Sequence, residues 1–355
     1  MTLHFPPHLH FPLLFLITIC LCMNSTFAGK ALNLYPFFQV YANGTVHRYE
    51  EIKFVPPSNN PKTGVQSKDV AILPQKEVSA RLYLPKISRK NQKFPLLFYI
   101  HGGGFCIQSA FSPLYDSYLH KLTAQANVLV VSINYRLAPE HPIPACYDDS
   151  WDVMNWAARG KEPWLKQHAN FSRVFLAGDS AGANIANNMM IRASKESHFV
   201  LSLVGMALVD PYFGNGKPDA LWTYLYPKTN GIDDPRFNPA AHPKILSKLK
   251  CSKIYVFTAG KDYLRDRAWT YYETMKKIGW KGELRIKETK GEGHVFHLFN
   301  PTSEKAKDLM NTLVHFLGCS IIRHGNYVNS ESRVSEFRIT VIIFINVLAF
   351  LIAYA

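Results

Sequence analysis

The sequence predicts an α/β fold with a mostly parallel central sheet and flanking helices. Two continuous apolar runs, at residues 94–100 and 128–133, are typical of strands that are covered on both faces. A helical segment at residues 117–125 separates them, and strand and helix patterns keep alternating further along the chain. A strand that leads through Gly-x-Ser-x-Gly, at residues 178–182, into a helix completes the pattern.

The other predicted elements follow in chain order. They are an alternating edge strand at 78–84, a helix at 150–158, and strands at 201–209, 254–258 and 283–288. Residues 56–66 are rich in Pro, Asn, Ser and Lys and are predicted to form a surface loop. Residues 211–243 carry many Gly and Pro residues and break the alternation. Together with residues 33–68 they are interpreted as a lid over the site, with a long surface crossing as the alternative.

Composition excludes several classes of protein. Hydrophobic residues make up 47% of the 355 residues, which indicates a globular protein with a large core. The formal net charge of +14 raises the question of nucleic-acid binding. Lysines and arginines are, however, interspersed with acids, as at residues 261–267, and no basic run or nucleic-acid-binding motif occurs. We therefore expect a solvated basic surface and no nucleic-acid partner.

Six cysteines are present, and none belongs to a Cys-x-x-Cys pair. Zinc-binding and thiol redox sites are therefore not indicated. Cys20 and Cys22 lie inside an apolar run, where they act as small hydrophobic residues. For the other four cysteines free thiols are the default interpretation, with disulfides left open.

Both ends of the chain differ from the body. Residues 1–28 contain an apolar run followed by small residues, which predicts a signal peptide or an apolar N-terminal extension. The body at residues 31–319 is uniform in composition and is predicted to be one domain. A polar linker at 320–338 and an apolar tail at 339–355 follow it.

The two apolar ends together predict membrane association through the secretory pathway. The C-terminal tail is interpreted as a membrane anchor or as the signal for a GPI anchor, and an error of gene prediction is a further interpretation. A cytoplasmic protein is the alternative.

Ser180 is the predicted nucleophile. It follows a buried strand and precedes a helix on which Ala181, Ile185 and Met189 recur every fourth residue. In this context Gly-x-Ser-x-Gly forms a tight turn that presents the serine above the amino terminus of the helix, where negative charge is favoured. An ordinary serine N-cap is the alternative interpretation.

The stretch from His101 to Phe105 supplies an oxyanion hole in this prediction. Three glycines directly follow the strand that ends at Ile100, so their backbone amides can turn inward without obstruction by side chains. We expect Gly102, Gly103 and Ala181 to donate to the oxyanion. His101 and Gly104 are predicted to support the loop.

The acid and the base are predicted at the ends of later strands. Asp262 follows the strand at 254–258, and His294 lies on a glycine-flanked loop after the strand at 283–288. Asp266 and His297 lie one helical turn further on, where a surface ion pair and a packing role are expected. The order Ser180, Asp262, His294 is the order of the α/β-hydrolase fold, with the predicted lid added to it.

These residues predict hydrolysis of small carboxylic esters through an acyl-serine intermediate. The substrate is expected to be a small molecule, and the reaction requires no metal and no cofactor. The oligomeric state and the acyl and alcohol groups are left open.

The chain also resembles plant carboxylesterases of the hormone-sensitive-lipase group. The matching motifs include His-Gly-Gly-Gly-Phe-Cys (101–106), Gly-Asp-Ser-Ala-Gly (178–182), Lys-Asp-Tyr-Leu-Arg-Asp (261–266) and Gly-Glu-Gly-His (291–294). The resemblance implies Ser180, Asp262 and His294 as the triad and the loop from His101 to Gly103 as the oxyanion loop. It also implies that the segment after Ala31 contributes to the lid.

The same resemblance implies two alternatives to an esterase. One is a lyase like 2-hydroxyisoflavanone dehydratase, which would use the same histidine and oxyanion loop. The other is a hormone-binding protein like the gibberellin receptor, against which the intact His294 argues. Relatives usually have histidines where Asn187 and Asn188 stand, and apolar extensions at both ends are unusual among them.

Overall fold

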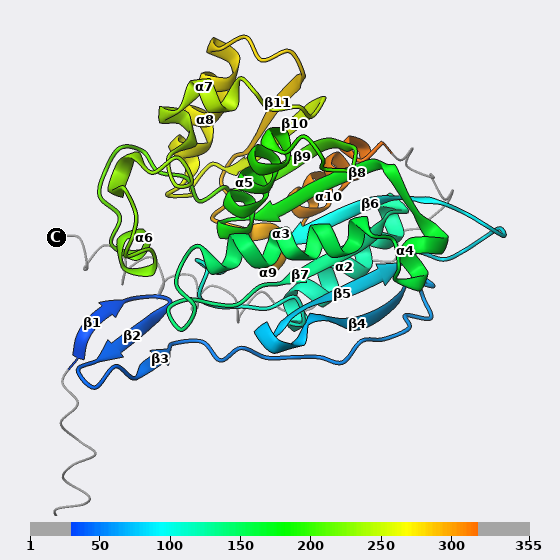
Figure 1. The fold of residues 1–355 in the computed structure, drawn as a ribbon, viewed down its shortest axis with the longest axis horizontal. Coiled ribbons are helices and arrows are strands. Elements are labelled where there is room, and N and C mark those ends of the chain that lie inside the picture. Colours follow the sequence, from blue (N-terminus) through cyan, green and yellow to red (C-terminus); the bar gives the residue numbers. More distant parts are fainter. Residues whose placement is uncertain (1–29, 319–355) are drawn as a thin grey trace, which may run out of the picture. The chain divides into compact units, whose positions relative to one another are not determined.

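The computed structural model describes residues 30–318 (Figure 1). The predictions for residues 1–28, 320–338 and 339–355, including the signal peptide and the apolar tail, lie outside the described residues. Within residues 30–318, no helix combines the length and apolar character needed to span a bilayer. Cys106, Cys146 and Cys251 are free thiols, and all three are buried.

An eight-stranded sheet forms the centre of the molecule, in the order β11-β10-β9-β8-β6-β7-β5-β4. Its parallel strands are β6 (Phe94–Ile100), β7 (Leu129–Asn134), β8 (Ala169–Asp179), β9 (Leu203–Val209), β10 (Lys253–Ala259) and β11 (Glu283–Thr289). Two antiparallel strands complete one end, β4 (Gln66–Leu73) and β5 (Val78–Leu84). The predicted fold class is confirmed.

The prediction that residues 78–84 form the edge strand is wrong. β5 lies between β4 and β7, and most of its residues are buried. Arg81 on β5 is buried because Asp69 of β4 and Asp116 of the following helix pair with its guanidinium, at 2.6 and 3.0 Å. The predicted loop and lid overlap only residues 66–68 of β4, and the rest of this strand is not predicted, because its charged residues mask its alternation.

Helices cover both faces of the sheet (Figure 1). One face is covered by α3 (Ala145–Ala158), α5 (Ala181–Lys195) and α8 (Arg265–Lys277), and the other by α2 (Pro113–Ala126), α9 (Phe296–Phe299) and α10 (Glu304–Phe316). Shorter helices are α4 (Pro163–His168), α6 (Ala220–Leu225) and α7 (Pro243–Leu246). The helices predicted at 117–125 and 150–158 both begin several residues earlier than expected.

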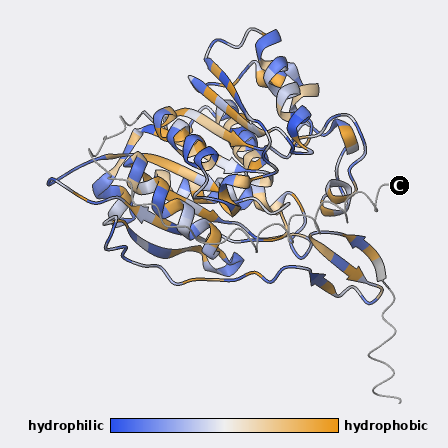
Figure 2. Ribbon diagram, turned by 180° about the vertical axis from the view of Figure 1, so that it is seen from behind, coloured by the Kyte–Doolittle hydropathy of each residue, from blue (hydrophilic) through white to orange (hydrophobic). Residues whose placement is uncertain are grey.

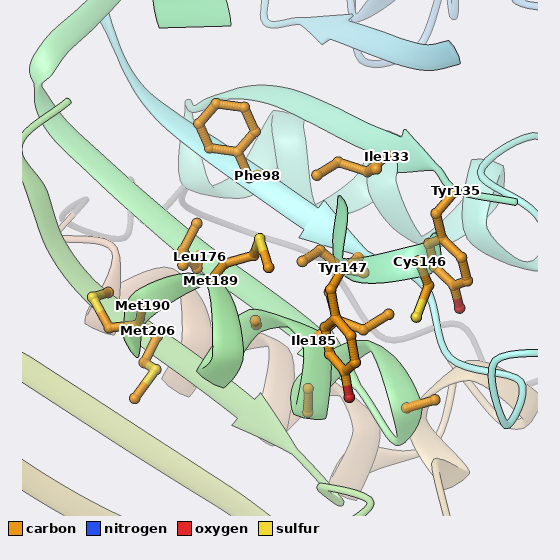
Figure 3. Packing of buried hydrophobic residues seen from close by; sticks show 14 of the residues in the cluster. Phe98, Ile133, Tyr135, Cys146, Tyr147, Leu176, Ile185, Met189, Met190 and Met206 are labelled. Carbon is orange, nitrogen blue, oxygen red and sulfur yellow. The ribbon is translucent and has the colours of Figure 1, made fainter. Parts of the chain in front are cut away.

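The core has two layers because successive residues of a strand point to opposite faces. On β6, Phe98 belongs to the cluster under α3 and α5, whereas Tyr99 belongs to the cluster under α2. Figure 3 shows Phe98 in this first cluster with Leu176 of β8, Met206 of β9 and Met189 of α5. Hydrophobic colour is concentrated in the sheet and the inner sides of its helices (Figure 2).

The N-terminal segment forms a small separate sheet of β1 (Lys30–Leu34), β2 (Phe38–Tyr41) and β3 (Val46–Arg48) beside the main sheet (Figure 1). The rings of Phe38 and of Tyr224 on α6 lie 5.9 Å apart, so this sheet contacts the segment at 211–243. The lid prediction for residues 33–68 is wrong for its last three residues, which lie in β4. Before them, Val55 donates its amide to the carbonyl of Phe111 on the body (3.0 Å).

Candidate active site

Ser180 lies in the turn between β8 and α5, with φ 52° and ψ −120°. A non-glycine residue with this backbone is strained, and the surrounding structure must hold it in place. Its amide donates to the carbonyl of Val209 on β9 (2.8 Å). At Gly182 a side chain would overlap the carbonyl of Ile100, so glycine lets α5 approach β6. The turn predicted at residues 178–182 is therefore present.

The structure brings the three predicted residues Ser180, His294 and Asp262 together. His294 Nε2 lies 2.9 Å from Ser180 Oγ, and His294 Nδ1 lies 2.8 Å from Asp262 Oδ2. The second oxygen of Asp262, Oδ1, accepts the amide of Leu264 at 2.9 Å. The side chain of Asp262 is fully buried, whereas that of His294 is 23% exposed. The three groups form one hydrogen-bonded chain from the buried acid to the serine.

The electrostatic environment favours the positively charged imidazole. Burial works to lower the pKa of His294, but the hydrogen bond to Asp262 and the charges of Asp262, Asp210 and Asp179 outweigh it and raise the pKa. Asp266, in contrast, pairs on the surface with Arg265 (2.8 Å), and His297 is buried with its ring 5.2 Å from that of Tyr118. Both have the lesser roles that were expected.

The amide of Gly102 is placed differently from the prediction. It donates to the hydroxyl of Tyr115 (2.8 Å) and so is not available to a bound oxyanion. Within residues 30–318, the amides of Gly103, Gly104 and Ala181 have no hydrogen-bond acceptor. Gly104, expected to be only a support, thus joins Gly103 and Ala181 as a free donor.

The same tyrosine connects the oxyanion loop to the residue before the serine. Tyr115 donates to Asp179 Oδ2 (2.8 Å), and Tyr99 donates to Asp179 Oδ1 (2.9 Å). Burial raises the pKa of Asp179 to about 6, and the two tyrosine hydroxyls oppose that rise. The only sequence signal for Asp179 was its place inside the Gly-x-Ser-x-Gly stretch.

His101 supports the loop as predicted. Its Nδ1 lies 2.9 Å from the carbonyl oxygen of Gly102, and its ring stacks on Tyr135 with centroids 4.2 Å apart. The Tyr135 hydroxyl donates in turn to the carbonyl of His101 (2.9 Å). Burial lowers the pKa of His101 to about 4, so the imidazole is neutral at pH 7.

One further acid, Asp210, lies at the end of β9 beside the triad. Ligand atoms of Asp210, Asp262 and His294 lie within 4.8 Å of one another, a spacing that a metal ion could use. Both oxygens of Asp210 already accept backbone amides, and Nδ1 of His294 is bonded to Asp262. A cation bound at Nδ1 of His294 would therefore replace the hydrogen bond to Asp262. Sequence reasoning missed Asp210, although it directly follows a predicted strand as Asp262 does.

The small N-terminal sheet contacts the oxyanion loop directly. A Cβ atom at Gly104 would lie 2.6 Å from the ring of Phe37, and Gly104 has φ 58°, so glycine suits both the space and the backbone. Arg48 donates to the carbonyls of Cys106 (2.7 Å) and Ala138 (3.1 Å) and pairs with Glu140. This sheet thus lies over one wall of the site.

The segment at 211–243 is tied to the helix that follows the serine. Asn184 donates to the carbonyls of Tyr212 (2.9 Å) and Arg236 (2.8 Å), and Asn188 donates to Arg236 at 3.1 Å. Asn187 instead accepts from the hydroxyl of Tyr271 (2.9 Å). The asparagines that depart from the family pattern therefore have structural contacts.

Comparisons with known proteins show the family of the chain. A model of the alpha/beta hydrolase fold matches residues 97–298. The chain is 41% identical over 323 residues to 2-hydroxyisoflavanone dehydratase of Glycyrrhiza echinata, covering 83% of this chain and 98% of that protein. It is 42% identical over 312 residues to probable carboxylesterase 1 of Arabidopsis thaliana, covering 81% and 97%.

Solved structures of esterases have the same fold. An esterase of Pyrobaculum calidifontis is 25% identical, with a TM-score of 0.59 over 71% of this chain and 84% of that chain. The resemblance inferred from the motifs is confirmed. The chain belongs to the alpha/beta hydrolase fold family, in the hormone-sensitive-lipase-like group that contains these plant proteins.

Proposed function

We propose that this protein is a serine carboxylesterase that hydrolyses small-molecule esters with Ser180 as nucleophile, His294 as base and Asp262 as the acid of the triad. The observation that carries the proposal is the hydrogen-bonded chain from Asp262 through His294 to Ser180, at 2.8 and 2.9 Å. The membership of the chain among carboxylesterase relatives supports the same chemistry.

In the first half of the reaction, Ser180 Oγ attacks the ester carbonyl while its proton passes to His294 Nε2. Asp262 holds the imidazole in the correct tautomer and stabilises its charged form. The carbonyl oxygen becomes an oxyanion, which accepts from the amides of Gly103, Gly104 and Ala181. Each such donor lowers the barrier by roughly 3 kcal/mol. The intermediate collapses when His294 returns the proton to the leaving alcohol.

In the second half, water replaces the alcohol. His294 accepts a proton from the water as it attacks the acyl-serine, and the same amides stabilise the second oxyanion. As the bond between the acyl carbon and Ser180 Oγ breaks, His294 returns the proton to Oγ, which releases the carboxylic acid and restores the hydroxyl of Ser180. Bonds and protons balance with water as the only co-reactant.

Ser180→Ala tests the proposal. We expect this variant to fold, to lose hydrolysis of p-nitrophenyl acetate, and to escape labelling by a fluorophosphonate, because each requires the hydroxyl. Ser247→Ala changes an exposed serine on the surface and should behave as wild type. Unchanged turnover in Ser180→Ala would refute the nucleophile assignment.

A second candidate is a dehydratase, which the 41% identity to 2-hydroxyisoflavanone dehydratase favours. In this reaction His294 and the oxyanion loop would assist the loss of water from the substrate and no acyl-serine would form. Incubation with 2-hydroxyisoflavanone beside a panel of esters separates the two candidates. Isoflavone formation that survives Ser180→Ala would favour the dehydratase.

We further propose, from the sequence, that the protein enters the secretory pathway and attaches to membranes through residues 339–355. The apolar character of residues 11–23 and 339–355 supports this proposal. Fractionation of plant cells tests it. A protein that is unglycosylated and released without detergent would contradict it.

A further inference from the structure

A buried carboxylate that the proposed reaction does not use lies next to the triad. Asp210 directly follows β9, has φ 44°, and is 1% exposed. Burial of an unpaired carboxylate is costly, so its partners indicate why it is retained.

Those partners are backbone amides in the two segments that lead to or carry the other members of the triad, the end of β10 and the loop of His294. Asp210 Oδ1 accepts the amide of Ala259, the last residue of β10, at 2.8 Å. Asp210 Oδ2 accepts the amide of Val295, the residue after His294, also at 2.8 Å. The carboxylate therefore joins the end of β10, three residues before Asp262, to the loop of the imidazole.

The amide of Asp210 fixes its own position. It donates to the carbonyl of Phe257 on β10 (2.9 Å), so the backbone and both carboxylate oxygens are engaged with β10 and with the loop of His294. A residue held by its backbone amide and by both carboxylate oxygens has little freedom to move. Its charge is consequently presented to the imidazole from a fixed place.

The titratable groups around His294 come from the ends of three strands and from one helix. They are Asp262 and Tyr263 after β10, Asp210 after β9, Asp179 at the end of β8, and His297 on α9. Three of them are acids, and among these acids Asp262 is hydrogen-bonded to the ring. Burial raises the pKa of Asp210 to about 7, the neighbouring His294 works against that rise, and the charge of Asp262 adds to it.

We propose that Asp210 is a positioning residue of the triad, which joins the loops of Asp262 and His294 and presents a second negative charge to the imidazole. The inference rests on the proposed esterase function and adds a fourth side chain to it. An imidazolium forms each time Ser180 or water gives up its proton, and the charge of Asp210 then adds to the stabilisation by Asp262. The fixed loops keep His294 Nε2 at hydrogen-bonding distance from Ser180.

Asp210→Asn tests the proposal, because it keeps the shape of the side chain, removes the charge and can accept only one of the two amides. We expect kcat for p-nitrophenyl acetate to fall by about 10- to 100-fold with KM little changed, since positioning is lost. The pKa of His294, followed by NMR in the resting protein, should fall by about one pH unit. The acidic limb of the kcat/KM profile should move to lower pH with it.

Asp149→Asn is the matched control. Asp149 is also fully buried and also accepts a backbone amide, that of Arg136 (2.9 Å), but on α3. It should lower stability without moving the pKa of His294. An Asp210→Asn protein with the wild-type kcat and the wild-type pKa of His294 would overturn the proposal.

Two further measurements keep the test decisive. If Asp210→Asn does not fold, Asp210→Ser takes its place, because the smaller side chain leaves room for water to accept the freed amides. Failure of both variants to fold would make Asp210 a structural residue only and would overturn the proposal. The NMR titration measures the pKa of His294 without turnover. If the wild-type protein has no esterase activity, the proposed function is refuted, and the titration still tests the effect of Asp210 on His294.

Discussion

Tyr115 donates a 2.8 Å hydrogen bond to Asp179, the residue directly before Ser180. The same hydroxyl accepts the amide of Gly102 at 2.8 Å. One buried oxygen therefore joins the oxyanion loop after β6 to the serine turn after β8. Relative placement of these two segments decides whether the amides of Gly103 and Ala181 converge on one point.

Tyr115→Phe should weaken both stability and catalysis. The variant leaves the amide of Gly102 and one oxygen of Asp179 buried without this partner, which costs about 1–3 kcal/mol of unfolding free energy. We expect kcat to fall more than KM changes, because the loop is misplaced in the transition state. Urea unfolding and hydrolysis of p-nitrophenyl acetate measure the two effects. A variant as stable and active as wild type would show that the bridge has no role.

The pH dependence of activity should follow His294. The imidazole accepts the proton of Ser180 only when it is neutral, and its pKa is raised above the ordinary value of about 6.5. Activity is therefore lost as pH falls, with a midpoint above 6.5 and a decline of about tenfold per pH unit below it. A kcat/KM profile with p-nitrophenyl acetate checks the prediction. A midpoint below 6.5 would contradict it.

Arg48→Ala should disconnect the small N-terminal sheet from the oxyanion loop. Arg48 donates to the carbonyls of Cys106 and Ala138, and its removal leaves both without this charged donor. The ion pair with Glu140 is half exposed and contributes little by itself. We expect kcat/KM to fall by about tenfold, because the amides of Gly103 and Gly104 lie on the loop that Arg48 holds.

Arg192→Ala is the control for this experiment. Arg192 also forms an ion pair, with Asp148 at 3.2 Å, but at the surface of α3 and α5. It should leave kcat/KM unchanged. Equal losses in both variants would indicate general destabilisation and would refute a specific role for Arg48.

The parts of this protein that were predicted correctly are those specified by residues close together in the chain. The strand, turn and helix around Ser180 follow from one continuous stretch, and Asp262 and His294 each follow a strand with its own apolar pattern. The order of these elements was enough to predict that they converge.

The parts that were missed depend on residues far apart in the chain. Nothing near Gly102 indicates that its amide is taken by Tyr115, thirteen residues later on α2. β4 was missed because the charged residues Lys68 and Asp69 are typical of a solvent-exposed loop. The reason for Asp69 is its ion pair with the buried Arg81 of β5, which the sequence alone does not show. Asp210, in contrast, could have been predicted, since it follows β9 as Asp262 follows β10.

His297 should make the protein sensitive to acid. Its imidazole is buried, neither ring nitrogen has a hydrogen-bond partner among residues 30–318, and burial lowers its pKa to about 3. In the unfolded chain the pKa is about 6.5, so below pH 6.5 the unfolded state binds a proton that the folded state does not. This group alone costs about 3 kcal/mol of unfolding free energy as pH falls from 6.5 to 4.

His297→Leu should remove that loss, because leucine has a similar volume and no group to protonate. Unfolding by urea at several pH values should show a free energy that declines by about 3 kcal/mol less than in wild type between pH 6.5 and 4. At pH 7 the variant should be at least as stable, since a buried polar group without a partner is replaced by an apolar one. His315→Leu, on the exposed side of α10, is the control and should keep the wild-type decline. If the free energy of unfolding of His297→Leu declines as much as that of wild type, a water molecule or a local opening already satisfies the imidazole. Burial of His297 would then not lower the stability of the protein in acid.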